Sequence, residues 1–192
     1  MLTTENEIES KFNISYLPKL EFANSKILEK IQKRCDRKLR WKKHSKVNFW
    51  NCSLYENSLL QGKSIDFILK KVNPLVGYGV FAKNPISYLT YIGEYTGIVR
   101  KRHKKQDSLN DYVFGYVIGP QDTPWVIDAE KKGNFTRFIN HSYTPNLTSR
   151  WMICDGVAHI ILFANRKIKA GEQLTYDYGP YYWRKRSFPQ DF

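Results

Sequence analysis

A stretch in the C-terminal half of the chain, residues 137–146, limits its possible structures more than any other part. It reads RFINHSYTPN. The apolar pair Phe138 and Ile139 is followed at once by Asn140, His141 and Ser142, whose polar side chains suit irregular backbone that faces a ligand. We therefore expect a buried segment that ends at a binding site.

A second distinctive stretch follows at residues 171–179 and reads GEQLTYDYG. If residues 174–178 form a strand, Tyr176 and Tyr178 share one face of it, because strand side chains alternate with a period of two. Two phenol groups would then line one surface.

The formal net charge of +13 on 192 residues limits the partners of this chain. A strongly basic protein is drawn to polyanions or to an acidic partner, so nucleic acid bound through the basic surface is one expected partner. The densest basic run is RKRHKK at residues 100–105. It fits a nuclear import signal, a nucleic-acid contact or a substrate-docking loop, and equally a solvated surface loop.

The cysteines and the apolar runs exclude several classes of protein. Cys35, Cys52 and Cys154 are far apart in the sequence and form no CxxC motif, so we expect free thiols, no disulfide framework and no metal site. The acidic first residues lack the pattern of a secretory signal. The longest apolar run, residues 160–164, is too short to span a bilayer, and we expect a soluble chain without a membrane partner.

Hydrophobic periodicity predicts one long helix near the N-terminus. It would run from Ser25 to about Lys43, with Asn24 or Ser25 as its cap. Apolar side chains recur there every fourth residue, at Ile27, Ile31, Cys35 and Leu39. The other faces of this helix are basic and would be solvated or bind a partner, a second copy of the chain included, so a homodimer is one expected assembly. Residues 41–61 lack a clear period, and we expect them to be irregular with short elements.

Short strands bounded by proline and glycine are expected in the rest of the chain. They are predicted at residues 64–72, 79–82, 111–118, 125–129, 148–153 and 157–164, with a strand pair or hairpin over 89–99 around Gly93 and Gly97. Residues 119–124 are expected to form a turn. This pattern predicts a mostly β fold with few helices, of the α+β class.

Four motifs, in this order, resemble those of the SET-domain protein lysine methyltransferases. They are GYG at 77–79, YIGE at 91–94, RFINHS at 137–142 and EQLTYDYG at 172–179. The resemblance covers roughly residues 72–183. It implies the SET fold of small β-sheets with a knot-like threading of the C-terminal segment, preceded here by a helical N-terminal segment.

The resemblance also predicts how the chain is divided. We expect an N-terminal accessory segment with one long helix at 1–63, a SET catalytic domain at 64–180 and a short C-terminal tail at 181–192. The cysteine-rich zinc modules that often precede and follow a SET domain have no counterpart here, so a compact form is expected. Trp183 and Phe188, or a partner or second subunit, would then cover the adenine or one wall of the lysine channel.

The resemblance implies a binding site for S-adenosylmethionine. Gly77, Tyr78 and Gly79 would contact its methionine part through their backbone, and Asn140 and His141 would bind its amino group and the edge of its adenine. The expected cofactor-binding set is completed by Tyr112, Arg137, Tyr178 and Trp183.

Three tyrosines are the expected catalytic residues. Tyr178 would aim its phenol at the reaction centre and organise the methyl group and the amine through weak contacts. Tyr112 resembles a second family tyrosine near the target lysine. Tyr176 would limit the number of methyl groups, because its hydroxyl fills space beside the amine, and we expect mainly monomethyl-lysine.

Two further residues are expected to support this region. Tyr91 would line it, and Arg137 would hold the site together through an ion pair with Glu94 or Asp177.

The resemblance therefore implies a protein lysine N-methyltransferase that uses S-adenosylmethionine and acts on a flexible basic tail of a histone or histone-like protein. Two alternatives stay open: a catalytically silent SET-type binding module, and a basic nucleic-acid or chromatin-associated protein. Uptake and turnover of S-adenosylmethionine would distinguish an active enzyme from the silent binding module. The salt dependence of nucleic-acid binding tests the second alternative. We expect the protein to act in the cytoplasm or nucleus, and in a host cell nucleus if its source is a bacterium.

Overall fold

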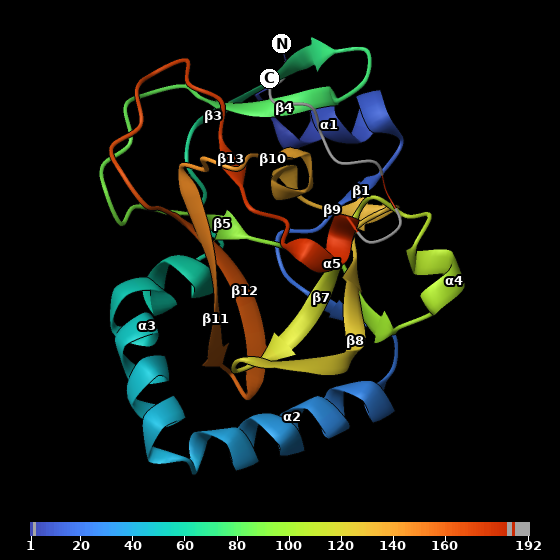
Figure 1. The fold of residues 1–192 in the computed structure, drawn as a ribbon, viewed down its shortest axis with the longest axis vertical. Helices are drawn as coiled ribbons and strands as arrows, with labels where there is room; N and C mark the ends of the chain where they lie inside the picture. Colours follow the sequence, from blue (N-terminus) through green and yellow to red (C-terminus); the bar gives the residue numbers. More distant parts are fainter. Residues whose placement is uncertain (2, 184–185, 187–192) are drawn as a thin grey trace.

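The computed structural model describes residue 1, residues 3–183 and residue 186. Phe188 and most of the expected tail therefore lie outside the described residues. Within the described part, small sheets stand above two long helices, and a short hairpin lies at the other end of the molecule (Figure 1). The helices are α1 (Glu5–Phe12), α2 (Ser25–Leu39), α3 (Lys42–Leu60), α4 (Lys104–Asp107), the 3-10 helix η1 (Phe135–Phe138) and α5 (Pro180–Trp183).

The strands are short and divide among five sheets. They are β1 (Ser15–Tyr16), β2 (Glu21–Phe22), β3 (Phe67–Asn73), β4 (Gly77–Ala82), β5 (Tyr91–Glu94), β6 (Ile98–Lys101), β7 (Val113–Ile118), β8 (Gln121–Asp128), β9 (Lys132–Gly133), β10 (Asn140–His141), β11 (Leu147–Cys154), β12 (Val157–Ala164) and β13 (Thr175–Tyr176). The predicted mixture of many strands with an N-terminal helical segment is confirmed.

Helix α2 packs against the four-stranded sheet, whose order is β2-β6-β8-β7. Asn24 caps the helix by accepting a hydrogen bond from the backbone N–H of Ile27, as predicted. Ile31 and Cys35 are fully buried and pack in one cluster with Tyr116 of β7. The helix ends at Leu39 rather than near Lys43.

Helix α3 shows that the expectation of irregular structure at residues 41–61, and of one long helix in the N-terminal segment, was wrong. Its buried positions are Asn48, Asn51, Tyr55 and Leu59. They follow a helical spacing, but two of the four are polar, so no apolar period marks this helix in the sequence.

The two asparagines of α3 bind the outer edge of β11, the terminal strand of the sheet β11-β12-β5. Asn48 donates from Nδ2 to the carbonyl of Ile153 over 3.0 Å and accepts the Ile153 N–H over 2.6 Å. Asn51 donates to the carbonyl of Trp151 over 2.9 Å. The helix thus satisfies edge groups that a neighbouring strand would otherwise bind.

The strand pair or hairpin expected over residues 89–99 is present as two strands, but they do not pair with each other, so the hairpin was wrong. Strand β5 pairs with β12, whereas β6 pairs with β8 and β2, so the two strands belong to different sheets. Gly97 has a packing role, because a Cβ atom there would collide with the backbone carbonyl of Asp128 on β8. The turn before β8 is shorter than expected as well, since β7 ends at Ile118 and β8 begins at Gln121.

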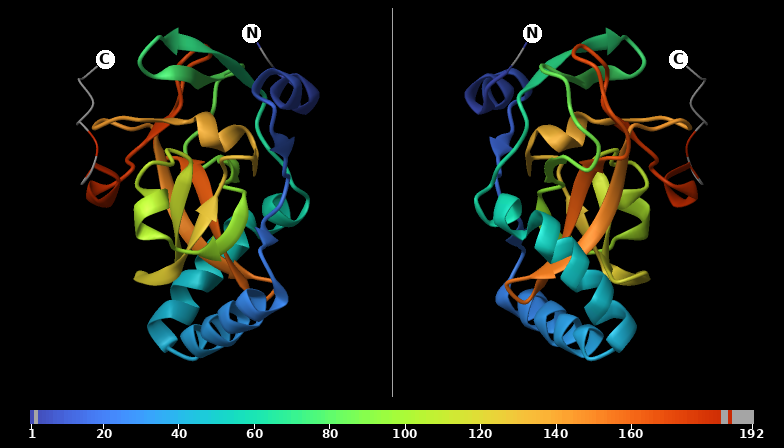
Figure 2. Two further views of the ribbon diagram at one scale, coloured as in Figure 1. Left: turned by 90° about the vertical axis from the view of Figure 1, so that its right-hand side faces the viewer. Right: turned by 90° about the vertical axis from the view of Figure 1, so that its left-hand side faces the viewer.

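The N-terminal residues join the sheets of the central domain. Strand β1 pairs in parallel with β9, and β2 pairs in parallel with β6. Ile8 of α1 is fully buried in the cluster that contains the stacked rings of Phe67 and Phe135, with centroids 4.3 Å apart. Figure 2 shows this N-terminal segment running along one side of the molecule. The domain limits at residues 63 and 180 stay our proposal.

The two stretches singled out in the sequence meet at the parallel pair β10–β13. Asn140 is opposite Thr175, and His141 is opposite Tyr176. Strand β13 is shorter than the expected 174–178, yet the rings of Tyr176 and Tyr178 still lie 4.7 Å apart. No helix in the described part of the chain is long and apolar enough to cross a membrane.

We predict that Asn48→Ala lowers the free energy of unfolding by about 2–4 kcal/mol, because both backbone groups of Ile153 lose a buried partner. Urea unfolding followed by circular dichroism measures the loss. Asn57→Ala, at an exposed position of the same helix, is the matched control and should change stability by less than about 0.5 kcal/mol. Equal losses in both variants would contradict a specific role for the Asn48 contacts.

Candidate active site

The glycine motif on β4 lies against Asn140 of β10. The side chain of Asn140 donates from Nδ2 to the carbonyl of Tyr78 over 3.1 Å. A Cβ atom on Gly79 would approach Asn140 Nδ2 to 3.0 Å, and Gln173 Nε2 and Val72 Cγ2 to 2.8 Å. A side chain at 79 would have to displace these three side chains, so glycine allows β4 to approach β10 this closely.

His141 is held between the backbone of Tyr178 and the ring of Trp183. Its Nδ1 accepts the backbone N–H of Tyr178 over 3.1 Å, and its ring centroid lies 4.9 Å from that of Trp183. The carboxylate oxygen Oδ1 of Asp177 lies 3.6 Å from the same nitrogen. The His141 side chain is 5% exposed, so its orientation is fixed.

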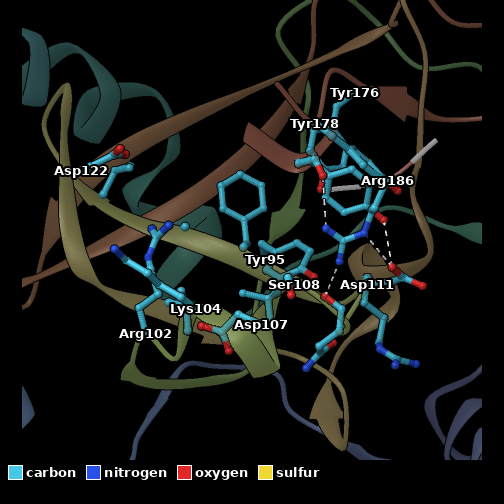
Figure 3. A pocket seen from close by; sticks show the side chains of 18 residues that line it. Tyr95, Arg102, Lys104, Asp107, Ser108, Asp111, Asp122, Tyr176, Tyr178 and Arg186 are labelled. Atoms are coloured by element: carbon cyan, nitrogen blue, oxygen red, sulfur yellow. Dashed lines mark hydrogen bonds and ion pairs between the residues drawn. The ribbon is translucent and has the colours of Figure 1, made fainter. Parts of the chain in front are cut away.

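Next to this group is a cavity of about 540 Å³ with an aromatic wall. The aromatic residues that line it are Tyr95, Phe114, Tyr176, Tyr178 and Tyr182. Tyr176 and Tyr178 lie on one side of the cavity, and the charged residues Asp122 and Arg102 lie on the other (Figure 3). Tyr95 lies between these two sides.

Tyr178 belongs both to the aromatic cavity and to the group of residues around His141. It lines the cavity, and its ring centroid lies 5.5 Å from that of His141. Its hydroxyl donates to the carbonyl of Ile139 over 2.8 Å, which fixes the phenol. Burial, followed by the neighbouring Tyr182, raises the pKa of Tyr178 well above its ordinary value, so the phenol stays neutral.

Tyr176 lies deeper in the same wall. Its ring stacks on Phe114 with centroids 6.0 Å apart, and its side chain is buried. Burial, followed by the nearby Tyr178, raises the pKa of Tyr176 as well. The cavity therefore presents neutral phenols at neutral pH.

Arg137 is placed differently from the prediction. It forms no ion pair with Glu94 or Asp177 in the described part of the chain. Its guanidinium carbon lies 3.5 Å from the ring centroid of Tyr112, and its Nη2 donates to the carbonyl of Glu130 over 3.1 Å. Burial lowers the pKa of Arg137.

Glu94 is engaged elsewhere, which explains the missing pair. Its Oε1 lies 2.6 Å from Nδ1 of His159. Burial opposes a charge on His159, but the hydrogen bond and the charge of Glu94, together with the carbonyl of Cys154 and the charge of Asp155, outweigh it and raise the pKa of the imidazole. This buried contact joins β5 to β12, and neither residue lines the aromatic cavity.

Tyr91 lies away from the cavity, so the expectation that it lines the same region was wrong. Its ring packs 6.2 Å from Tyr55 of α3, in the cluster beneath β11 and β12. Tyr112 lies behind the cavity wall, between the lining residues Asp111 and Val113, and its carbonyl accepts the hydroxyl of Tyr95 over 3.0 Å. The role of Tyr112 stays a prediction.

Sequence reasoning missed three residues of this site: Tyr95, Tyr182 and Arg186. Arg186 donates from Nε to Asp111 Oδ1 over 3.0 Å, and its guanidinium lies over the ring of Tyr182 at 4.2 Å. Figure 3 shows this contact at one side of the cavity. Tyr95 directly follows the YIGE motif, which was the available signal. The contact with Asp111 is invisible in the sequence because it joins residues far apart in the chain.

The geometry can now be compared with known proteins. The SET domain family matches residues 77–179, more than half of this chain. The chain belongs to the SET-domain family of protein-lysine N-methyltransferases. This confirms the resemblance drawn from the four motifs.

Members of the SET-domain family that are similar to this chain include Histone-lysine N-methyltransferase EZA1 of Arabidopsis thaliana. It is 35% identical over 113 residues, which cover 58% of this chain and 13% of that protein. The chain therefore spans a small part of the length of this relative.

Structures of polycomb repressive complex 2 of Chaetomium thermophilum, ctPRC2, are also similar. One is bound to S-adenosylmethionine in an autoinhibited conformation, and another is in complex with H3K27me3 and H3K27M. Each is 28% identical with a TM-score of 0.55 and covers 64% of this chain, and 16% and 15% of the matched chains respectively. The SET fold of the central domain is thereby confirmed.

We predict that Gly79→Ala raises the dissociation constant for S-adenosylmethionine at least tenfold, or ~1.4 kcal/mol. The added methyl group would push Asn140 away from the carbonyl of Tyr78. Isothermal titration calorimetry measures the change. Gly115→Ala is the control, because its Cβ would meet Arg102 at an ordinary 3.5 Å. Unchanged binding by the Gly79 variant would place the donor elsewhere.

Proposed function

We propose that this protein is a protein lysine N-methyltransferase that uses S-adenosylmethionine as methyl donor. The observation that carries the proposal is the position of Tyr178, which lines the aromatic cavity and also contacts His141 beside the glycine motif. Tyr178 would thus belong both to the site for the methyl donor and to the cavity for the acceptor. This arrangement suits the transfer of a methyl group between two molecules bound side by side.

The residues on β4 and β10 fit S-adenosylmethionine. At Gly79 the backbone of β4 comes close to Asn140, and a side chain there would have to displace the Asn140 amide; His141 is held beside it by the backbone N–H of Tyr178. Gly77, Tyr78 and Gly79 would hold its methionine part, Asn140 and His141 its polar groups, and Trp183 would cover it. When bound, this donor supplies an electrophilic methyl group on a sulfonium.

The cavity suits the side chain of lysine. A lysine amine must be neutral to accept a methyl group, and its pKa of about 10.4 makes this cost about 4–5 kcal/mol at pH 7. An aromatic wall of neutral phenols lowers that cost by desolvating the ammonium form. Tyr95, Tyr176 and Tyr178 are the described residues that would orient the amine.

The proposed substrate is a lysine in a flexible tail of a histone or histone-like protein. The name of the similar Arabidopsis thaliana protein, a histone-lysine N-methyltransferase, and the ctPRC2 structure in complex with H3K27me3 and H3K27M support this class. Asp122 lines the cavity and would attract a neighbouring basic residue of such a tail, despite the overall charge of +13. Asp111 also lines the cavity, but its carboxylate is already paired with Arg186. We propose action in the nucleus or cytoplasm.

The proposal is tested by incubating the purified chain with isotopically labelled S-adenosylmethionine, a chelator and candidate histones, followed by mass spectrometry of lysines. We expect labelled lysine in a tail and retained donor binding with the chelator present. Donor binding without any labelled lysine, across basic protein substrates, would favour the silent binding module. Loss of both binding and folding in the chelator would reveal a metal requirement.

We predict that Tyr178→Phe lowers the rate of methyl transfer by about 100-fold, because it removes a fixed hydroxyl at the transfer point. Donor affinity should stay close to that of the unmodified protein, since the ring and its stacking remain, while the lost hydrogen bond to the Ile139 carbonyl lowers the thermal midpoint by a few degrees. Steady-state kinetics and calorimetry separate these effects. A variant with nearly unchanged turnover would move the catalytic role to another tyrosine, with Tyr112 tested next.

We further predict mainly monomethyl-lysine as product, and a shift towards di- and trimethyl-lysine in Tyr176→Phe. The Tyr176 hydroxyl occupies part of the buried wall, and its removal leaves space for a methylated amine. Mass spectra at low turnover and excess substrate measure the distribution. Predominant trimethyl-lysine from the unmodified enzyme would overturn the assignment of Tyr176.

A further inference from the structure

The junction of α2 and α3 carries a long stretch of positive charge. Residues 33–46 contain eight lysine or arginine residues and one acidic residue, Asp36. The exposed members are Lys33, Arg37, Arg40, Lys42, Lys43 and Lys46. Among the described residues, none of the eight forms an ion pair. The charge of this surface is therefore not neutralised within the molecule.

Three large aromatic side chains project from the same junction. Trp41, Phe49 and Trp50 are 69%, 64% and 59% exposed. Phe49 and Trp50 lie edge to face with centroids 6.0 Å apart. Trp41 directly precedes Lys42 and Lys43, and Phe49 and Trp50 follow Lys46 by three and four residues on α3, the spacing of neighbours on a helix surface. We call residues 33–50 the α2–α3 corner. Exposed rings between cations form the surface on which unpaired bases stack while their phosphates are neutralised.

The densest basic run of the sequence, residues 100–105, is less suited to this task. Arg100 is held by Asp107 at 2.6 Å and Asp128 at 2.7 Å. Arg102 and Lys104 line the aromatic cavity. The α2–α3 corner lies at the end of the molecule formed by the two long helices, opposite the β3–β4 hairpin (Figures 1 and 2).

We propose that the α2–α3 corner binds a single-stranded nucleic acid. Its lysines and arginines neutralise phosphates, and Trp41, Phe49 and Trp50 stack on unpaired bases. Stacking favours a single strand because the base faces of a duplex are covered by one another. The surface is separate from the residues assigned to methyl transfer, so this inference goes beyond the proposed function.

The test uses the full chain and labelled oligonucleotides of about twenty nucleotides, oligo-U, oligo-dT and a duplex, with fluorescence anisotropy at several salt concentrations. We expect single strands to bind more tightly than the duplex. The triple variant Lys42→Gln, Lys43→Gln, Lys46→Gln should weaken binding and lower the salt slope by about two, since each phosphate contact contributes roughly 0.7. The double variant Trp41→Leu, Trp50→Leu should weaken single-strand binding about tenfold and leave the salt slope unchanged.

The matched control removes three exposed charges elsewhere, with Lys71→Gln, Lys83→Gln and Lys167→Gln. It should leave affinity within about twofold. The proposal would be overturned if the control lost as much affinity as the lysine variant, or if the tryptophan variant bound single strands as tightly as the unmodified protein. Either result would show that the oligonucleotide is attracted by the overall positive charge alone. Corner-dependent binding to vesicles containing phosphatidylserine, with no affinity for single strands, would overturn it in favour of a membrane surface. All readouts measure binding, so they are independent of whether the protein transfers methyl groups.

Discussion

The parallel pairing of β10 with β13 is the contact on which the candidate site depends. It places Asn140 and His141 beside the segment that carries Tyr176 and Tyr178. Asn146 fixes the pairing from the side: its Nδ2 donates to the carbonyl of Gln173 over 2.8 Å, and its Oδ1 accepts the Thr175 N–H over 2.9 Å. Asn146 is 2% exposed, so these bonds are shielded from water. Without this pairing, Asn140 and His141 would not be held at a fixed position relative to Tyr176 and Tyr178.

The same segment also binds β4 before it reaches β10. The backbone N–H of Leu174 donates to the carbonyl of Val80 over 2.8 Å, and that of Ala82 donates to the carbonyl of Glu172 over 2.9 Å. The segment therefore aligns the glycine motif, the Asn140 amide and Tyr178 in succession. Rigid backbone pairing, rather than long flexible side chains, sets the positions of the groups assigned to the transfer, which is the arrangement that catalysis by positioning requires.

The parts of the structure that could be predicted from the sequence are those marked by a short motif or by a continuous apolar run. The motifs around Gly79, Asn140 and Tyr178 do come together, and β12 has the predicted limits Val157–Ala164. Helix α3 escaped prediction because Asn48 and Asn51 occupy its buried face, and the pattern of apolar residues therefore carried no period. Helix α1 had an available signal, a capping box formed by Thr4 and Glu7, which was not used. The partners of Arg137 and Glu94 could not be predicted, since they depend on which strands become neighbours.

The first strands of the chain have a consequence for the order of folding during synthesis. Ser15 and Tyr16 pair with Lys132 and Gly133, so the N-terminal segment has no partner for this strand until most of the chain has left the ribosome. Contacts of such long sequence separation form late and slow the final step of folding. Ile8 of α1 is likewise buried only when Phe67 and Phe135 of its cluster have been synthesised, so the N-terminal helix gains its core contacts together with β1.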